Sequence, residues 1–279
     1  MRIAVIGSGT RSESLPPWLG ELAAARGGEA FIVNPRLSAF AFTPYELLVI
    51  DLGYVDAAQR AAGEPGCGAI VLNSFADYGI DAARAAVAVP VIGAGEATIE
   101  AASAAGRHSF AIVTVWPESM GFLYEERLRA VRGGSRCVAI RRISAERELE
   151  RLGAPDGVME RMARGESAVL QALLRECEAA VSDDGAAAIA LGCTCMAPIG
   201  PALAAACRVP VYESSRTAVS AAMDAAAAGV SAPSPRARDA RLVPGLVTGG
   251  LAALRAGDVA ATAAAECTPC NALDFEGTR

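Results

Sequence analysis

The sequence predicts an α/β fold in which two similar parallel sheets are each covered by helices, and three observations support this. Short runs of apolar, β-branched residues alternate along the chain with longer alanine-rich stretches. One strand–turn–helix pattern occurs twice. Hydrophobic residues fill 53% of the 279 positions, which is enough for a substantial buried core. We therefore expect two related α/β halves.

The expected strands are short and continuously apolar, as strands buried on both faces of a parallel sheet usually are. They span residues 2–6, 30–33, 47–51, 69–72, 91–92, 110–115, 138–141, 187–191 and 211–212. The expected helices are longer and span residues 17–26, 55–63, 81–87, 96–105, 120–131, 158–181, 199–207 and 216–228. After a proline-containing linker at 231–238, residues 251–265 are expected to form a last helix that packs on the first half or on a partner subunit.

Two segments of the chain resemble each other closely in sequence and spacing. AIVLNS at 69–74 leads through a helix to Pro90, and AIALGC at 188–193 leads through a helix to Pro210. Ser74 precedes Pro90 by 16 positions (90 − 74), and Cys193 precedes Pro210 by 17 (210 − 193). A duplicated half-domain explains this order. We expect residues 1–105 with 214–279 to form the first half, to which the C-terminal helices return, and residues 106–213 to form the second.

Small and polar residues follow the expected strands at their carboxyl ends, where the ligand crevice of an open parallel sheet lies. The residues expected there are Ser8, Thr10, Asn73, Ser74, Phe75, Thr114, Trp116, Gly192, Cys193 and Thr194. A two-fold arrangement of the halves would make Ser74 and Cys193 face each other. The alternative for Ser74 is a structural one, because serine after a strand is an ordinary helix cap.

Cys193 lies beyond a glycine and before an expected helix start in the segment Leu-Gly-Cys-Thr-Cys-Met. Backbone N–H groups and the positive end of a helix favour a thiolate over a thiol there. The same amides suit an anionic carboxylate or a developing enolate oxygen. Cys193 is therefore the candidate acid/base for removing a proton from carbon, and the alternative is that it packs in the core. Cys195, two residues further on, is expected to point away.

Composition excludes several kinds of partner. The net charge of −6 leaves no basic surface for nucleic acid. No apolar run approaches the roughly 20 residues that span a bilayer, so we expect no membrane partner, a cytoplasmic location and reduced cysteines. His108 is the single histidine and is interpreted as structural. Cys267 and Cys270 have CxxC spacing but no second pair, so they predict no metal or redox site.

Four motifs in consistent order resemble those of the hydantoin racemases. SFADYGIDAAR at 74–84 looks like their first signature, CFGDPGxxAAR. PVIGAGEA at 90–97 resembles PVVGIGEA, and AIVTV at 111–115 resembles the strand that opens their second half. LGCTCMA at 191–197 resembles LGCAGMA. On these motifs the chain is identified as a member of the aspartate/glutamate/hydantoin racemase superfamily.

The resemblance implies two flavodoxin-like halves related by a pseudo-two-fold, with the active site in the cleft between them and without metal, pyridoxal phosphate or nucleotide. It implies a relay in which one cysteine thiolate removes the α-proton and the opposite cysteine returns a proton to the other face. The second cysteine corresponds to Cys193, whereas Ser74 occupies the position of the first. The substrate is then a small anionic carboxylate or a hydantoin-like carbon acid. The resemblance is also compatible with a homo-oligomer.

Ser74 is the main departure from the family pattern, because a serine hydroxyl is a far weaker acid than a thiol. The first hypothesis is a racemase or epimerase in which Cys193 is the acid/base opposite Ser74. Arylmalonate decarboxylases of the same superfamily also retain only the second cysteine, which protonates an enediolate. A malonate-type decarboxylase is therefore one alternative, and a non-catalytic small-molecule binder is another.

Three bulky or acidic side chains near the expected strand ends have open roles. Trp116 lies where related decarboxylases carry a tyrosine, and it either donates its indole N–H to an anion or forms a wall of the site. Glu96 and Glu213 follow the two Pro-Val strands. They either meet a substrate amine or stabilise the helix starts through the dipole.

Overall fold

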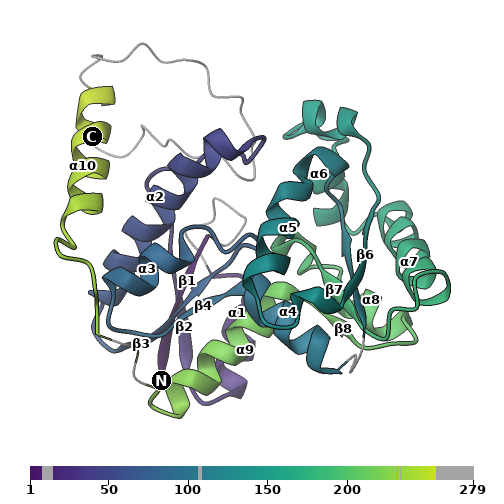
Figure 1. The fold of residues 1–279 in the computed structure, drawn as a ribbon, viewed down its shortest axis with the longest axis horizontal. Coiled ribbons are helices and arrows are strands. Elements are labelled where there is room, and N and C mark those ends of the chain that lie inside the picture. The colour runs from purple at the N-terminus through teal and green to yellow at the C-terminus, as the bar shows by residue number, and fades with distance from the viewer. Residues whose placement is uncertain (8–14, 106–108, 231, 233, 256–279) are drawn as a thin grey trace. The chain divides into compact units, whose positions relative to one another are not determined.

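The computed structural model describes residues 1–7, 15–105, 109–230, 232 and 234–255, and these form two parallel four-stranded sheets with flanking helices (Figure 1). The first sheet has the strand order β2-β1-β3-β4, and the second has the order β6-β5-β7-β8. The two orders are the same when each sheet is numbered from its own first strand. The predicted α/β fold with two parallel sheets is confirmed.

The strands are two to six residues long. They are β1 (Arg2–Ile6), β2 (Glu29–Val33), β3 (Cys67–Leu72), β4 (Val91–Gly93), β5 (Phe110–Thr114), β6 (Cys137–Arg142), β7 (Ile189–Leu191) and β8 (Val211–Tyr212). The α-helices are α1 (Pro17–Ala25), α2 (Pro44–Ala62), α3 (Ile80–Ala86), α4 (Ala94–Ala105), α5 (Gly121–Ala130), α6 (Val158–Ala163), α7 (Ser167–Ser182), α8 (Gly200–Ala206), α9 (Ser214–Ala227) and α10 (Leu242–Arg255). Short 3-10 helices are η1 (Glu118–Met120), η2 (Gly134–Arg136), η3 (Glu146–Arg151) and η4 (Thr194–Met196).

Most residues of the central strands of each sheet are completely buried. Residues 3–6 of β1 and 69–72 of β3 expose no surface, and the same is true of residues 110–113 of β5 and 189–191 of β7. Helix α2 packs on the strands of the first sheet, and α7 packs on β5 and β6 of the second. Because these residues are buried on both faces of the sheet, their sequences are continuously apolar and do not alternate between apolar and polar residues.

The sequence repeat is visible in individual backbone hydrogen bonds. The N–H of Ile70 in β3 donates to the carbonyl of Pro90 at 2.8 Å, and the N–H of Ile189 in β7 donates to the carbonyl of Pro210 at 2.9 Å. Proline has no N–H to give to a sheet, yet its carbonyl is still an acceptor, so both prolines can stand at the start of a strand. The two segments therefore fold alike, as a duplication predicts.

The chain divides into two compact units. Unit 1 comprises Met1–Leu72, Tyr78–Val91 and Ala222–Arg279, and unit 2 comprises Asn73–Asp77 and Ile92–Ala221. The predicted halves divide the chain at other positions. Helix α4, which was expected in the first half, packs on β7 and β8 of the second sheet. The last boundary between the two units lies within α9, after Ala221. The predicted half boundaries and the pseudo-two-fold relation stay predictions.

Residues 47–51, predicted as a strand, lie instead inside α2, and that prediction is wrong. Thr43 caps this helix, since its hydroxyl accepts the N–H of Tyr45 at 3.2 Å and its own N–H donates to the Glu46 carboxylate at 2.8 Å. A reciprocal pair of this kind starts a helix whatever the strand propensity of the apolar run that follows. Among the described residues no helix, α2 included, combines the length and apolar character needed to cross a membrane.

Two further helix predictions need correction. The helix expected at 158–181 is two helices, α6 and α7, because Gly165 between them adopts a left-handed backbone conformation with φ of 68°. The last helix, expected at 251–265, begins earlier as α10 at Leu242, and residues 256–265 lie outside the described part of the chain. Helix α10 packs beside α2 (Figure 1), where Arg36 donates to Thr248 at 3.2 Å.

Candidate active site

Cys193 lies directly beyond β7, at the carboxyl end of a central strand of the second sheet. From β5 the chain continues to β6 on one side, and from β7 it continues to β8 on the other, so the strand order reverses between β5 and β7. Ligands of open parallel sheets bind beyond the strand ends where the order reverses. The backbone of Cys193 is extended, with φ of −150° and ψ of 133°, and η4 begins at the next residue. Its sulfur accepts the N–H of Cys195 at 3.2 Å. Cys193 therefore occupies the cap position of this turn.

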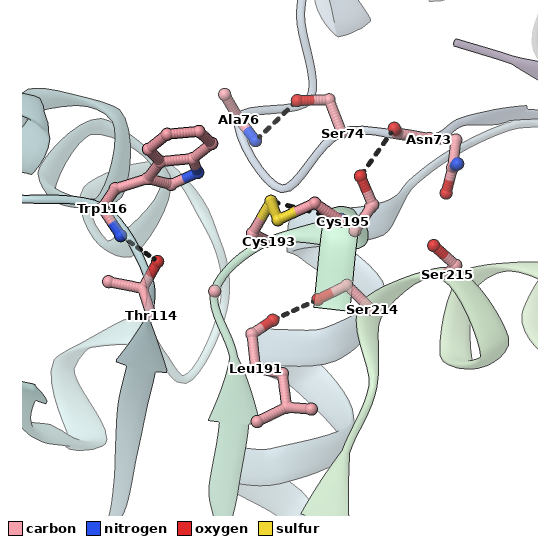
Figure 2. Close-up of a disulfide and its surroundings, with 12 residues drawn as sticks. Asn73, Ser74, Ala76, Thr114, Trp116, Leu191, Cys193, Cys195, Ser214 and Ser215 are labelled. Carbon is pink, nitrogen blue, oxygen red and sulfur yellow. Dashed lines mark hydrogen bonds between the residues drawn. A yellow bond between two sulfur atoms is a disulfide. The ribbon is translucent and has the colours of Figure 1, made fainter. Parts of the chain in front are cut away.

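The sulfur atoms of Cys193 and Cys195 are bonded to each other (Figure 2). The prediction that Cys195 points away is wrong, and so is the expectation of reduced cysteines for this pair. A 3-10 turn, not an α-helix, follows Cys193, and it brings the two Cα atoms to 5.2 Å, within the usual range for a disulfide. Figure 2 shows the disulfide beyond the strand that ends at Leu191, with the Ser74 turn drawn above it and Trp116 to its left.

Tyr124 fixes the turn that carries Cys193. Its hydroxyl lies 2.6 Å from that of Thr114 and donates to the carbonyl of Gly192 at 3.0 Å. A Cβ atom at position 192 would lie 2.8 Å from Ile112 and 2.9 Å from the Tyr124 ring, so only glycine fits. The hydroxyl of Tyr124, from α5, thereby links the end of β5 with the end of β7 through two hydrogen bonds.

Ser74 belongs to a tight turn that follows β3 and lies in unit 2. Its hydroxyl accepts the N–H of Ala76 at 3.3 Å, and its carbonyl accepts the N–H of Asp77 at 3.0 Å. Phe75 in this turn is buried, and its ring packs on Tyr124 with 5.5 Å between centroids. The Ser74 hydroxyl therefore has a local structural role, of the kind that serine commonly plays in turns.

Asp77 holds the Ser74 turn against α4. Its side chain is buried, and its carboxylate accepts the N–H groups of Gly95 at 2.8 Å and Glu96 at 2.7 Å. The turn approaches the start of α4 so closely that a Cβ atom at Gly95 would lie 1.9 Å from the carbonyl oxygen of Phe75. Asp77 also has a positive φ of 51°, which aspartate tolerates better than most residues.

Asp77 and Glu213 are two buried acids whose carboxylates accept N–H groups at the start of a helix, Asp77 at α4 and Glu213 at α9. Burial raises the pKa of Asp77 to about 7, although the two N–H groups oppose this shift. Burial likewise raises the pKa of Glu213, whose carboxylate accepts N–H groups of Ser215 at 2.8 Å and Arg216 at 2.9 Å. These bonds support the helix-start role of Glu213. Within the described ranges, no three His, Cys, Asp or Glu side chains gather as metal ligands.

One buried polar atom near the disulfide lacks a hydrogen-bond partner within the described structure. It is the side-chain oxygen of Asn73, a residue that is 4% exposed. Thr194 connects the turn after β7 with the end of β3 by donating its hydroxyl to the backbone carbonyl of Asn73 at 3.1 Å. Buried polar atoms are normally paired with protein, water or ligand, so Asn73 is a candidate ligand contact.

The structure therefore brings together most of the residues predicted for the site. Asn73, Ser74, Phe75, Thr114, Trp116, Gly192, Cys193 and Thr194 all lie in unit 2 around the ends of β5 and β7 and in the turn after β3. Thr114 is buried, and its hydroxyl also accepts the N–H of Trp116 at 3.3 Å. Ser8, Thr10, His108, Cys267 and Cys270 lie outside the described residues. Substrate binding by the first group stays a prediction.

Sequence reasoning missed the residues that hold this arrangement. Tyr124 lies in α5, whose sequence GFLYEERLRA contains no motif that points to a role at the strand ends. Asp77 carried a signal, since the Ser74 motif contains it, but its partners are 18 and 19 positions away. Ser214, whose hydroxyl donates to the carbonyl of Leu191, follows Glu213 in a short polar run, and its partner lies 23 positions earlier in the chain.

The fold and the site define an α/β protein with two sheets of equal strand order and a cysteine beyond a central strand. The model of the family described as Asp/Glu/Hydantoin racemase matches residues 49–222. The chain belongs to this family.

Individual relatives agree with the assignment. The hydantoin racemase of Paenarthrobacter aurescens is 30% identical over 160 residues, which are 57% of this chain and 61% of that protein. The matched part thus spans about three-fifths of that relative's length. The structure of allantoin racemase from Klebsiella pneumoniae is 26% identical with a TM-score of 0.69, covering 84% of this chain and 90% of that one. A mutant of arylmalonate decarboxylase shares the fold at 20% identity, with a TM-score of 0.55 and coverage of 84% and 96%.

Proposed function

We propose that this chain is a cofactor-independent racemase or epimerase that acts on the α-carbon of a hydantoin-like or small carboxylate carbon acid. The position of Cys193 carries the proposal, because it lies beyond β7 at the point where this type of sheet binds ligands. Membership of the racemase family and the likeness to hydantoin and allantoin racemases support the substrate class.

In the proposed reaction, the reduced Cys193 thiolate removes the α-proton from one face of the substrate. The N–H of Cys195, which already points at the sulfur at 3.2 Å, stabilises the thiolate. The enolate that forms needs N–H or O–H donors, and the NH2 group of the Asn73 side chain and the Ser215 hydroxyl are the candidates. Because Cys193 must be a thiol, the proposal also requires a reducing compartment such as the cytoplasm.

Ser74 makes the proposed reaction asymmetric. A serine hydroxyl cannot replace a thiolate as a base at neutral pH, and here it is engaged in a turn with Ala76. Proton transfer on the Cys193 face is therefore fast, and return of a proton on the Ser74 face is slow. One enantiomer should exchange its α-hydrogen with solvent much faster than it racemises.

The test is proton exchange in deuterated water with the full chain kept reduced by dithiothreitol. A chiral hydantoin, allantoin, aspartate and glutamate are each followed by NMR for loss of the α-hydrogen and by polarimetry for loss of optical rotation. Exchange that outpaces loss of rotation in one enantiomer supports the proposal. No exchange with any of these substrates counts against it.

A decarboxylase is the second candidate, favoured by one observation. Only Cys193 remains of the expected cysteine pair, and a single proton donor is sufficient to protonate an enediolate after carbon dioxide leaves. Arylmalonates added to the same assay distinguish the two reactions. Release of carbon dioxide with incorporation of deuterium at one face supports the decarboxylase and rejects the racemase.

A further inference from the structure

The Cys193–Cys195 bond occupies the sulfur that the proposed function needs. A disulfide sulfur has no proton to give and no thiolate charge to accept one, so the oxidised chain lacks its acid/base. The two residues are separated by Thr194 alone, and their Cα atoms are 5.2 Å apart. The bond therefore closes within one turn and needs no other segment of the chain.

Cys195 has no evident part in the reaction itself. Its backbone N–H contacts Cys193, and that contact does not depend on the side chain at position 195. The hydantoin racemase motif LGCAGMA, which LGCTCMA resembles, carries glycine at this position. A second thiol beside the acid/base is thus a property of this chain that proton transfer does not require.

We propose that Cys193 and Cys195 form a reversible oxidation site for hydroperoxides, in which the dithiol is the active form and the disulfide is the inactive form. This inference rests on the proposed function of Cys193. The site is assigned to the pair, and its modifying reagent is a hydroperoxide such as hydrogen peroxide.

The chemistry balances in two steps. The Cys193 thiolate attacks the hydroperoxide, so that an S–O bond forms, the O–O bond breaks and an alcohol or water leaves after taking up a proton. The Cys195 thiolate then attacks the resulting sulfenic acid, so that the S–S bond forms and the S–O bond breaks with release of water. Each sulfur loses one electron, and the peroxide takes up both. A dithiol reductant reverses the change by two thiol–disulfide exchanges and is itself oxidised to a disulfide.

The other cysteines of the described structure are poorer targets for peroxide, with one exception. Burial raises the pKa of Cys67, and it raises the pKa of Cys137 to about 11, so both stay thiols. Cys177 and Cys207 hydrogen-bond to each other, which raises the pKa of Cys177 and lowers that of Cys207. Cys207 is consequently the competitor that an experiment must control.

The experiment uses the full chain carrying Cys267→Ser and Cys270→Ser, first reduced and then treated with hydrogen peroxide at molar equivalence. Peptide mass spectrometry follows the loss of two hydrogen atoms from the peptide that contains both residues. Proton exchange is measured before treatment, after it, and after addition of dithiothreitol. We expect exchange to fall by about 100-fold or more, as loss of a general acid/base does, and to recover when the disulfide is reduced.

Two variants complete the test. Cys195→Ala retains the backbone N–H at position 195, and its own exchange before treatment is the reference for the variant. With peroxide in severalfold molar excess, applied equally to the parent chain, Cys193 of this variant should be oxidised to the sulfinic acid, and dithiothreitol should not restore activity. Cys207→Ser should behave like the parent chain throughout. Full recovery of Cys195→Ala after peroxide, or a disulfide that leaves exchange unchanged, would overturn the inference. A disulfide that forms and is reduced while neither form exchanges any substrate supports the oxidation site and rejects the proposed function instead.

Discussion

The two corners of this protein, the turns after β3 and after β7, both lead from a strand to a helix but are secured by different chemistry. In the corner after β3, the carboxylate of Asp77 reaches the start of α4, 18 positions further along the chain. In the corner after β7, the local Cys193–Cys195 bond and the hydroxyl of Tyr124 hold the turn. Turns at similar places in the sequence repeat are therefore fixed by different groups. The corner held by sulfur has the reactive group, and the corner held by Asp77 has only the Ser74 hydroxyl.

Removing the reactive group from one corner should have the largest effect. Cys193→Ala in the reduced chain is expected to lower α-hydrogen exchange by about 100- to 10,000-fold, the usual contribution of a general acid/base. Far-UV circular dichroism should stay unchanged, because the Tyr124 and Gly192 contacts do not involve sulfur. Cys177→Ala, far along α7 from this turn, is the matched control. Retention of most of the exchange in Cys193→Ala would remove Cys193 from the mechanism.

Removing the carboxylate from the other corner should mainly affect stability. Asp77→Ala leaves the N–H groups of Gly95 and Glu96 without their acceptor, at a cost of about 1–3 kcal/mol for each buried donor. Urea unfolding should therefore show a lower midpoint with little change in slope. A midpoint equal to that of the parent would mean that Asp77 does not hold the turn to α4.

The free energy of unfolding should decrease as the pH rises, because the buried carboxyl group of Asp77 has a raised pKa. The pKa of Asp77 is about 7 in the folded chain, above its ordinary value of 3.8, so the folded state binds the extra proton between these values. Its contribution to stability is full below pH 4 and is lost as the pH rises to about 7. The free energy of unfolding of the parent relative to Asp77→Asn should thus fall across this range. Glu213→Gln should reveal a dependence of the same sign, since the pKa of Glu213 is also raised. A flat difference for both variants would contradict this.

Placing sulfur in both corners should make them functionally equivalent. Ser74→Cys introduces a group whose ordinary pKa of about 8.5 allows some thiolate at neutral pH. Under reducing conditions we expect loss of optical rotation to accelerate by about tenfold or more relative to α-hydrogen exchange. Ser74→Ala, which removes the hydroxyl without adding a thiol, is the control. Equal rates in the Cys and Ala variants would show that this side chain does not face the reacting carbon.

The smallest expected effect concerns the support of the Cys193 corner. Thr114→Val removes one hydrogen-bond partner of the Tyr124 hydroxyl and the acceptor of the Trp116 N–H but leaves the bond of Tyr124 to the Gly192 carbonyl, so the loss of stability should be about 1–2 kcal/mol. Exchange activity should change less than it does in Tyr124→Phe, which loses both bonds. The reverse order would assign Thr114 a direct role in binding substrate.

The sequence predicted the strands well because complete burial leaves an unambiguous apolar run, as in residues 69–72 and 110–113. It failed at residues 47–51, where the capping box of Thr43 and Glu46 outweighed strand propensity. The positions of Ser74 and Cys193 beyond β3 and β7 could be predicted, because a residue that follows a recognised strand in the sequence must lie at the end of that strand. Tyr124 and Asp77 could not be predicted, because their contacts join elements distant in sequence. The disulfide could not be predicted because the sequence indicates a helix start after Cys193, whereas the chain forms a 3-10 turn there.

The contact between α10 and α2 has a practical consequence for anyone who shortens this chain for expression. Asp56 in α2 is fully buried and is paired with Arg36 at 2.5 Å and Arg60 at 3.1 Å, and Arg36 also reaches Thr248 of α10. Val247 of α10 is itself buried. Truncation after Gly229 would remove α10, expose the ion pairs of Asp56 to solvent and uncover the side chains of α2 that α10 contacts. Soluble fragments should therefore retain the chain through position 255.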